Sequence, residues 1–456
     1  MERKELLFKA LRHEPITETP WVPFSGVHSG VLKGYTAEEV LKDGDKLFES
    51  LMEVNKLYKP HGQPVVFDLQ LEAECMGCDL HWAPDGPPSV ASHPLDGDED
   101  EAPEIPDDSL IPTPESGRIP MVLDVMRRMK AAVGDTTALY GLICGPFTLA
   151  SHLRGNNIFT DMFDFEDETK ELLAFTTKVA MAMSDYMIDA GMDVIAAVDP
   201  LISQISVNHF EEFMAEPYTK LFDHIREKGA FSSFFVCGDA SRNIESMCKT
   251  HCDAISIDEN VDLVATKTNI TDKYNVAIGG NVPLTTVMLH GNQQDNMKWA
   301  IEMMDKVEDK KNFILAPGCD MPYATPVENA IGIAEAVSNP DAVREMVANY
   351  VAVDEHIEVE LPDYEHLSKP LVEVFTLDSA TCAACTYMMG AANQAKETYG
   401  DKIDMVEYKF TLKENIARCV KMGVKNLPAM YINGQLKFSS IIPTKQELED
   451  AINAVM

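Results

Sequence analysis

Short apolar segments rich in β-branched and aromatic residues alternate with longer amphipathic segments through residues 1–352. The short segments have the length and composition of strands, whereas the longer ones repeat apolar residues at helical spacing. This pattern predicts eight strands, at residues 20–24, 64–69, 137–143, 193–198, 231–236, 254–257, 275–279 and 312–316. Strands that alternate with helices form a parallel sheet, and eight of them predict a (β/α)8 TIM barrel. An open doubly wound sheet is the alternative, although no glycine-rich nucleotide-binding motif follows any of these strands.

A second, shorter pattern follows an acidic, proline-containing stretch at residues 353–370. Over residues 371–456 the predicted order is strand, Cys-x-x-Cys, helix, strand, helix, hairpin and helix. We therefore expect an α/β chain of two domains, a large one at residues 1–352 and a small one at residues 371–456. Residues 353–370 would form the linker between them.

The charge and the cysteines of the chain narrow its possible partners. A net charge of −36 argues against nucleic acid and against an anionic membrane surface, because both require a basic protein surface. The N-terminal segment lacks the apolar core of a signal peptide, and no run of about 18 apolar residues could span a membrane. We therefore predict a cytoplasmic protein. In that compartment, several of the ten cysteines occur as pairs that indicate metal or redox sites rather than a disulfide framework.

Reactive side chains follow several strands of the predicted barrel. Asp199 follows strand 193–198, Cys237 follows strand 231–236, Glu259 lies two residues beyond strand 254–257, and Cys319 lies shortly after strand 312–316. These strand ends share the C-terminal face, where barrel enzymes carry their active sites. Two thiols and a carboxylate there could bind zinc with a fourth position open, and zinc could hold an incoming thiol as thiolate. Two buried structural cysteines are the alternative, and Asp199 could be catalytic or could cap a turn.

Six segments of the barrel region carry recognisable motifs: GPFTLASHLRG (145–155), DPLISQIS (199–206), VCGDA (236–240), ISIDENVDL (255–263), GGNVP (279–283) and APGCDMPYATPVENA (316–330). Together they resemble the uroporphyrinogen decarboxylase superfamily, and within it the methylcobalamin:coenzyme M methyltransferase branch. The resemblance implies a TIM barrel that uses methylcobalamin or a corrinoid protein. It also implies zinc bound by the His and Cys of an HxC motif on the fifth strand, by a Cys after the eighth strand, and by a nearby Glu.

Matched to this chain, the implied zinc ligands are Cys237, Cys319 and Glu259, whereas the histidine of the HxC motif falls on Phe235. Three interpretations remain open. Zinc could bind through the three remaining ligands, or His28 after the first strand could replace the missing one, although we expect His28 to be a solvated loop residue. The site could also be metal-free.

The small domain resembles the thioredoxin fold over residues 371–456. Cys382 and Cys385 form a CxxC motif at the start of a predicted helix, where the helix dipole lowers a thiol pKa. Pro428 matches the cis-proline that faces the motif in that family. We predict a dithiol/disulfide site, with simple packing or a metal clip as alternatives. The pairs Cys75/Cys78 and Cys248/Cys252 are expected to pack.

These observations predict a corrinoid-dependent methyltransferase with an attached dithiol redox domain. It would move a methyl group between a methylcorrinoid, free or on a corrinoid protein, and a thiol or another small acceptor, with assistance from zinc. A decarboxylase-like lyase of the same superfamily is one alternative. The other is a non-catalytic corrinoid-binding or redox partner protein, which the lost histidine at Phe235 favours and the two retained cysteines oppose.

Overall fold

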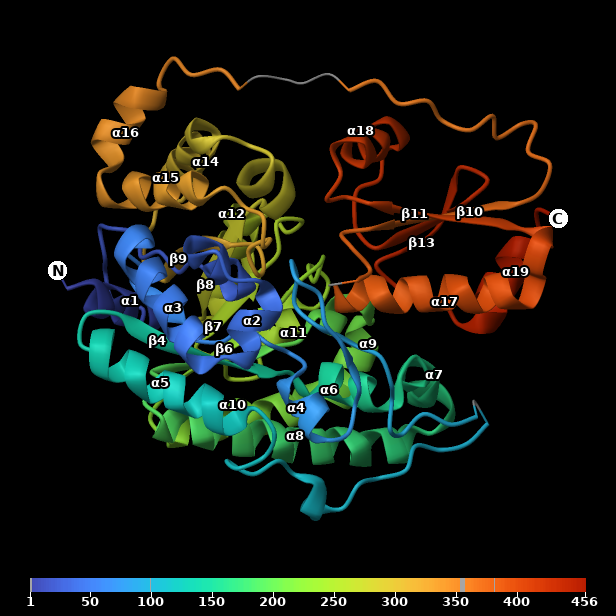
Figure 1. Ribbon diagram of the computed structural model, residues 1–456, viewed down its shortest axis with the longest axis horizontal. Helices are drawn as coiled ribbons and strands as arrows, with labels where there is room; N and C mark the ends of the chain where they lie inside the picture. Colours follow the sequence, from blue (N-terminus) through green and yellow to red (C-terminus); the bar gives the residue numbers. More distant parts are fainter. Residues whose placement is uncertain (1, 99, 353–356, 381) are drawn as a thin grey trace.

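Seven parallel strands form one curled sheet at the centre of the large domain (Figure 1). The computed structural model describes residues 2–98, 100–352, 357–380 and 382–456. The strands follow one another in the sheet as β1 (Gly62–Pro64), β4 (Ala138–Cys144), β5 (Val194–Val198), β6 (Phe231–Val236), β7 (Ala254–Ile257), β8 (Ala277–Val282) and β9 (Phe313–Pro317). Each overlaps a strand predicted from the sequence, so the predicted parallel α/β sheet is confirmed.

The remaining predicted strand, residues 20–24, connects the two edges of this sheet. Trp21 forms an isolated parallel bridge with Leu315 of β9, where the Val22 amide donates to the Leu315 carbonyl at 2.9 Å. On the other side, the His61 amide just before β1 donates to the Trp21 carbonyl at 2.9 Å. A sheet whose edges meet in this way is consistent with a TIM-type barrel.

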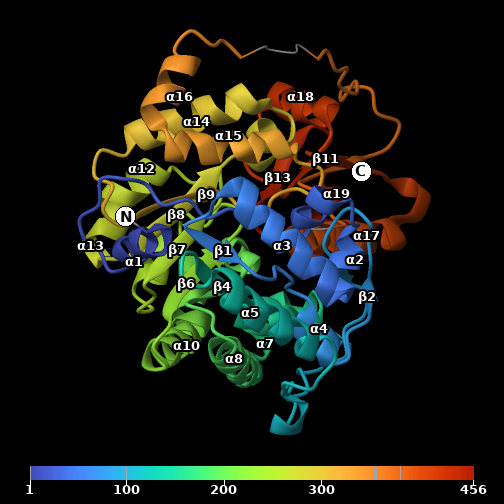
Figure 2. The same ribbon diagram turned by 60° about the vertical axis from the view of Figure 1, so that its left-hand side comes forward.

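Helices cover the outer face of the sheet (Figure 2), and an apolar cluster fills its inside. The outer helices include α3 (Gly44–Tyr58), α5 (Ile119–Val133), α8 (Glu166–Asp189), α10 (Ala215–Glu227), α14 (Gln293–Lys306), α15 (Val327–Ser338) and α16 (Pro340–Val347), whereas the apolar residues of α1 (Arg3–Leu11) belong to the inner cluster. Phe234 and Phe235 show the two faces, because both are fully buried yet belong to different clusters. Successive strand residues point to opposite faces, so Phe234 packs under the helices and Phe235 packs inside the sheet.

The small domain has a four-stranded sheet in the order β11-β10-β12-β13. Along the chain its elements are β10 (Leu371–Thr376), α17 (Ala383–Tyr399), β11 (Asp404–Lys409), α18 (Lys413–Met422), β12 (Ala429–Ile432), β13 (Gln435–Ser439) and α19 (Lys445–Asn453). β10 and β11 are parallel and the other pairs are antiparallel. This order matches the predicted pattern, and the Leu427–Pro428 peptide bond is cis.

The predicted linker separates α16 from β10. Its described part, residues 357–370, contains no helix or strand, and its residues 353–356 lie outside the described residues. None of the described helices is both long and apolar enough to cross a membrane.

The small domain packs against the loops at the C-terminal ends of the barrel strands. The Tyr387 hydroxyl of α17 donates to Ser151 Oγ in α6 (Pro146–Arg154), which follows β4, at 2.8 Å. Asn426 Nδ2 donates to Asp239 Oδ2, after β6, at 3.1 Å. His290, beyond β8, contacts the carbonyl of Thr411 through Nε2 at 2.9 Å. In Figure 1 the N-terminal end of α17 accordingly lies against the barrel.

Candidate functional site

Two cysteines from distant parts of the sequence meet at the C-terminal face of the barrel. Cys237 directly follows β6 and Cys319 lies two residues beyond β9. Their sulfurs form a disulfide with a Cα–Cα distance of 5.7 Å, and 82 residues separate them in sequence. The curvature of the sheet thus brings together the two thiols that the sequence placed at strand ends.

The disulfide bears directly on the predicted zinc site at Cys237, Cys319 and Glu259. Zinc coordinates thiolates, and the two sulfurs are instead bonded to each other. In the described part of the chain, no group of three or more His, Cys, Asp or Glu side chains is placed to hold a metal ion. The residues present therefore do not fit zinc in this form of the protein.

Glu259 lies next to the loop that carries Cys319. A Cβ atom added to Gly318 would come within 2.8 Å of the Glu259 amide nitrogen, so the two segments are in close contact. The Glu259 carboxylate accepts a hydrogen bond from the Leu284 amide. Burial, together with the neighbouring Asp258, raises the pKa of Glu259 to about 8. The carboxyl therefore retains its proton in much of the protein near neutral pH.

Asp258 precedes Glu259 at the end of β7, and no role was predicted for it from the sequence. Its Oδ2 accepts a hydrogen bond from the Gly238 amide at 2.9 Å, which ties the loop of Cys237 to the end of β7. Gly238 has a φ of +83°, and a Cβ atom there would lie 2.8 Å from Ser203 Oγ. Only glycine combines that backbone conformation with so close an approach. The position of Asp258 immediately after a strand was the available signal.

Glu72 is a second carboxyl that sequence reasoning missed. It is almost fully buried in α4 (Leu71–Cys75), and its Oε1 accepts a hydrogen bond from the Cys144 amide, at the end of β4, at 3.0 Å. Its Oε2 has no hydrogen-bond partner among the described residues. Burial raises the pKa of Glu72 to about 7. No local sequence pattern distinguishes it from the neighbouring Glu74.

Phe235, at the position of the HxC histidine, has become part of an aromatic cluster inside the barrel. Its side chain is fully buried, and its ring centroid lies 4.8 Å from that of Phe24 and 5.8 Å from that of Phe67. Apolar packing thus stands at the position where the resemblance implies a metal ligand. The site around the disulfide is consequently more apolar than an HxC motif would make it.

His28 does not replace the missing ligand in this structure. Its Nδ1 contacts the Tyr323 carbonyl at 3.0 Å and its Nε2 contacts the Tyr58 hydroxyl at 2.7 Å, so both ring nitrogens are engaged. The side chain is fully buried, and burial lowers its pKa to about 4. The expectation of a solvated loop histidine is therefore wrong, because two distant tyrosines enclose the ring.

Asp199 holds the start of α6. It is fully buried, and its carboxylate accepts hydrogen bonds from the Phe147 amide at 3.0 Å and the Thr148 amide at 3.1 Å. The hydroxyls of Thr148 and Tyr218 also donate to it. Burial raises the pKa of Asp199 to about 6 despite these donors. Of the two roles considered for Asp199, this geometry favours capping of a helix that itself contacts the small domain.

The CxxC cysteines lie at the start of α17 and are both free thiols. Cys382 is the N-cap residue of this 17-residue helix and is partly exposed, whereas Cys385 is buried. The Leu377 amide donates to Cys385 Sγ at 3.3 Å. Burial and the hydrogen bond with Cys382 raise the pKa of Cys385 well above its usual value. One thiol of the pair is thus accessible and the other is shielded.

The other cysteine pairs pack, as expected. Cys248 and Cys252 are buried free thiols, and Cys78 donates to the His152 carbonyl at 3.3 Å. Cys75 is a half-buried free thiol.

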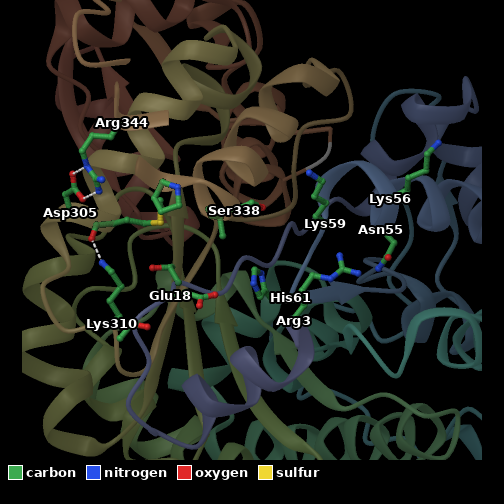
Figure 3. A pocket seen from close by; sticks show the side chains of 15 residues that line it. Arg3, Glu18, Asn55, Lys56, Lys59, His61, Asp305, Lys310, Ser338 and Arg344 are labelled. Carbon is green, nitrogen blue, oxygen red and sulfur yellow. Dashed lines mark hydrogen bonds and ion pairs between the residues drawn. The ribbon is translucent and has the colours of Figure 1, made fainter. Parts of the chain in front are cut away.

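A pocket of about 640 Å3 lies at the opposite end of the barrel (Figure 3). Its lining includes His61, which precedes β1, and Lys310, which precedes β9. Arg344 in this pocket is paired with Asp305 at 2.7 Å. In TIM-type barrels this end serves stability, so the C-terminal face remains the candidate site.

Comparison with known proteins agrees with the geometry of the barrel. A family model described as uroporphyrinogen decarboxylase (URO-D) matches residues 2–339. The methylcobamide:CoM methyltransferase MtbA of Methanosarcina mazei is 30% identical over 345 residues, which cover 74% of this chain and 97% of that protein. The protein of the same name from Methanosarcina acetivorans is 29% identical, with the same coverage of 74% and 97%.

A solved structure titled methyltransferase from Methanosarcina mazei superposes with a TM-score of 0.66. It is 22% identical and covers 74% of this chain and 98% of that chain, so it supports the fold alone. The family match ends at residue 339, and the small domain at residues 371–456 lies beyond it.

Proposed function

We propose, from the premise that this chain belongs to the uroporphyrinogen decarboxylase family and is a methyltransferase, that it transfers a methyl group between a methylcorrinoid and a small thiol. The observation that carries this proposal is the similarity to two methylcobamide:CoM methyltransferases over 97% of their length. The cysteine pair at the C-terminal face supports the same end of the barrel as the reacting site. A cytoplasmic location stays a prediction.

In the proposed reaction a thiol loses its proton and its sulfur attacks the methyl group of the methylcorrinoid. The sulfur–carbon bond forms while the cobalt–carbon bond breaks, and the electron pair of that bond stays on cobalt. The corrinoid is a substrate in this scheme, either free or carried by a corrinoid protein that would approach the C-terminal face. The loops after β6, β7 and β9 would form the floor of the substrate site.

Zinc belongs to the proposal only for a reduced form of the barrel cysteines. Cys237 and Cys319 would have to be free thiolates, and Glu259, whose backbone lies close to Gly318, would have to turn its carboxylate toward them as the third group. Elemental analysis of reduced protein, of oxidised protein and of the Cys237→Ser and Cys319→Ser variants tests this. About one zinc per chain in the reduced wild type alone would support the site, and metal-free reduced protein after incubation with zinc would refute it.

We further propose that the small domain is thioredoxin-like and that Cys382 and Cys385 form a dithiol/disulfide couple. The order of its elements and the position of Cys382 at a helix start support this. Reduction of an artificial aromatic disulfide by the full chain, lost in Cys382→Ser, is the expected result. Equal reduction by the variant would contradict the proposal.

Anaerobic turnover of methylcobalamin with 2-mercaptoethanesulfonate tests the methyl transfer. We expect the methylcobalamin absorbance to be lost only when the protein and the thiol are both present. The methylated thiol is identified by mass spectrometry. Binding of the corrinoid without turnover, under reducing conditions and with zinc supplied, would favour the non-catalytic alternative. Release of carbon dioxide from a carboxylated substrate would favour the decarboxylase-like lyase.

A further inference from the structure

We propose that the CxxC motif of the small domain reduces the Cys237–Cys319 disulfide of the barrel within the same chain. This inference rests on the dithiol role proposed above and names its substrate. It does not depend on which thiol accepts the methyl group. The chain would thus carry both a redox-active cysteine pair at its candidate active site and the domain that resets it.

The two cysteine pairs are in complementary oxidation states. Cys237 and Cys319 are joined as a disulfide, whereas Cys382 and Cys385 are free thiols. The barrel pair can therefore accept the two electrons that the CxxC pair can donate. Conversion of one dithiol and one disulfide into the other needs no additional reactant.

Contacts between the domains place the CxxC end of α17 on the face that carries the disulfide. α17 packs against the short helical segment η3 (Pro200–Gln204), which follows β5. Ser203 of that segment lies against Gly238, next to Cys237. The same loop of Cys237 contains Asp239, which is hydrogen-bonded to Asn426, two residues before Pro428. The loop of Cys237 is thus contacted by η3, on which α17 packs, and by Asn426 of the small domain.

The first half of α17 contributes several contacts to this docking surface. Tyr387 donates to Ser151, and its ring packs on that of Phe159 at a centroid distance of 5.9 Å. A Cβ atom on Gly390 would lie 2.8 Å from Asn156 Nδ2, so the helix backbone itself approaches the barrel closely. Cys382 and Cys319 both pack at the edge of one continuous apolar cluster. The small domain is therefore seated on the barrel and not merely tethered by the linker.

The accessibility of the two CxxC thiols sets the order of the exchange. Cys382 is partly exposed; it gives up its proton and attacks one sulfur of the barrel disulfide as a thiolate, so that a Cys382 mixed disulfide forms as the barrel sulfur–sulfur bond breaks. The displaced barrel sulfur leaves with the bonding electrons and takes up a proton. Buried Cys385 then gives up its proton and attacks Cys382, which releases the second barrel thiol.

The net change is the transfer of two electrons and two protons from the CxxC pair to the barrel pair. A small dithiol or a dithiol protein would then return the CxxC pair to its reduced form. Because only free barrel thiols can act as nucleophiles or bind a metal, the exchange would make the barrel site depend on the supply of reductant.

The test traps the mixed disulfide in the full chain. In Cys385→Ser the resolving thiol is absent, so Cys382 should remain linked to a barrel cysteine once iodoacetamide blocks the displaced thiol. Non-reducing peptide mapping should find this link at a yield independent of protein concentration. The additional change Cys75→Ser, at another half-buried free thiol, should leave the yield unchanged, and Cys382→Ser should abolish it.

A kinetic measurement covers the case in which the trapped species does not accumulate. The wild type and Cys382→Ser are first oxidised. Limiting dithiothreitol should then reduce the barrel disulfide of the wild type about tenfold faster than that of the variant. Equal rates together with no cross-link would overturn the inference. If the artificial disulfide were still reduced through Cys382, the dithiol role would survive that failure, and if it were not, both proposals would fall.

Discussion

Replacement of Phe235 by histidine tests whether apolar packing now occupies the position of the lost ligand. Phe235 is fully buried between Phe24 and Phe67, and full burial of a phenylalanine contributes about 1.5–3 kcal/mol. Each favourable aromatic pair adds about 0.5–1.5 kcal/mol, and a buried imidazole without a partner costs about 1–3 kcal/mol. In the oxidised protein we therefore expect Phe235→His to lower the free energy of unfolding by about 3.5 kcal/mol or more, the lower end of these contributions together.

The assay is urea unfolding of the full chain with the barrel disulfide intact, followed by intrinsic fluorescence. Phe235→Leu is the matched control, because it keeps an apolar side chain and should lose less, about 1–2 kcal/mol. An unchanged unfolding midpoint in Phe235→His would refute the assigned packing role. Under reducing conditions, added zinc should recover more stability in Phe235→His than in Phe235→Leu, since a bound ligand stabilises the state that binds it.

Three further predictions follow from single contacts. The pKa of Asp199 is about 6 in the folded protein, above its unfolded value of about 3.9. Its contribution to stability is therefore present below about pH 4 and is lost as the pH rises through 6. Asp199→Asn should remove this pH dependence, worth about 3 kcal/mol, in urea unfolding between pH 4 and 7, and an unchanged dependence of stability on pH would contradict the raised pKa. Gly238→Ala should destabilise the protein by about 1–3 kcal/mol more than Gly229→Ala. Both glycines have positive φ, but a methyl group at Gly229 meets open space whereas one at Gly238 meets Ser203. Equal shifts of the thermal unfolding midpoint would refute the close approach of Gly238 to Ser203. Asn426→Ala removes the hydrogen bond to Asp239 and should slow reduction of the barrel disulfide severalfold, as measured by timed thiol alkylation. Reduction of an artificial disulfide should stay at the wild-type rate. A parallel loss of both activities would argue against a docking role for Asn426.

Local sequence pattern was sufficient for most of the secondary structure and for the positions of the reactive groups along it, although predicted strand 64–69 shares only Pro64 with β1 and predicted strand 20–24 forms an isolated bridge. Runs of apolar residues predicted the strands because a parallel sheet is buried on both faces, so its strands carry apolar side chains at nearly every position. The ends of those runs predicted that Cys237 and Cys319 would share one face. In the small domain, the resemblance to the thioredoxin fold implied a cis bond before Pro428, and the structure has it.

What those groups do to one another was decided by the tertiary structure. His28 was expected in solvent, but Tyr58 and Tyr323 close over it from other elements. The ambiguity of Asp199 is narrowed by the donors that converge on it from α6 and α10, which no local pattern shows. Their positions relative to one another depend on how the sheet curls and how helices pack on it.

The same holds for the state of the cysteines and for their partners. Whether two thiols bind a metal or each other depends on a separation of a few ångströms, and the fold brings the Cα atoms of Cys237 and Cys319 to 5.7 Å. The CxxC motif lies over the C-terminal face of the barrel because of contacts such as that of Tyr387 with Ser151, two residues 236 positions apart. Sequence alone determined the reactive groups and the strands that carry them, because these follow from local periodicity. Only the packing of the two domains decided which groups meet, because such contacts depend on long-range geometry that no local pattern encodes.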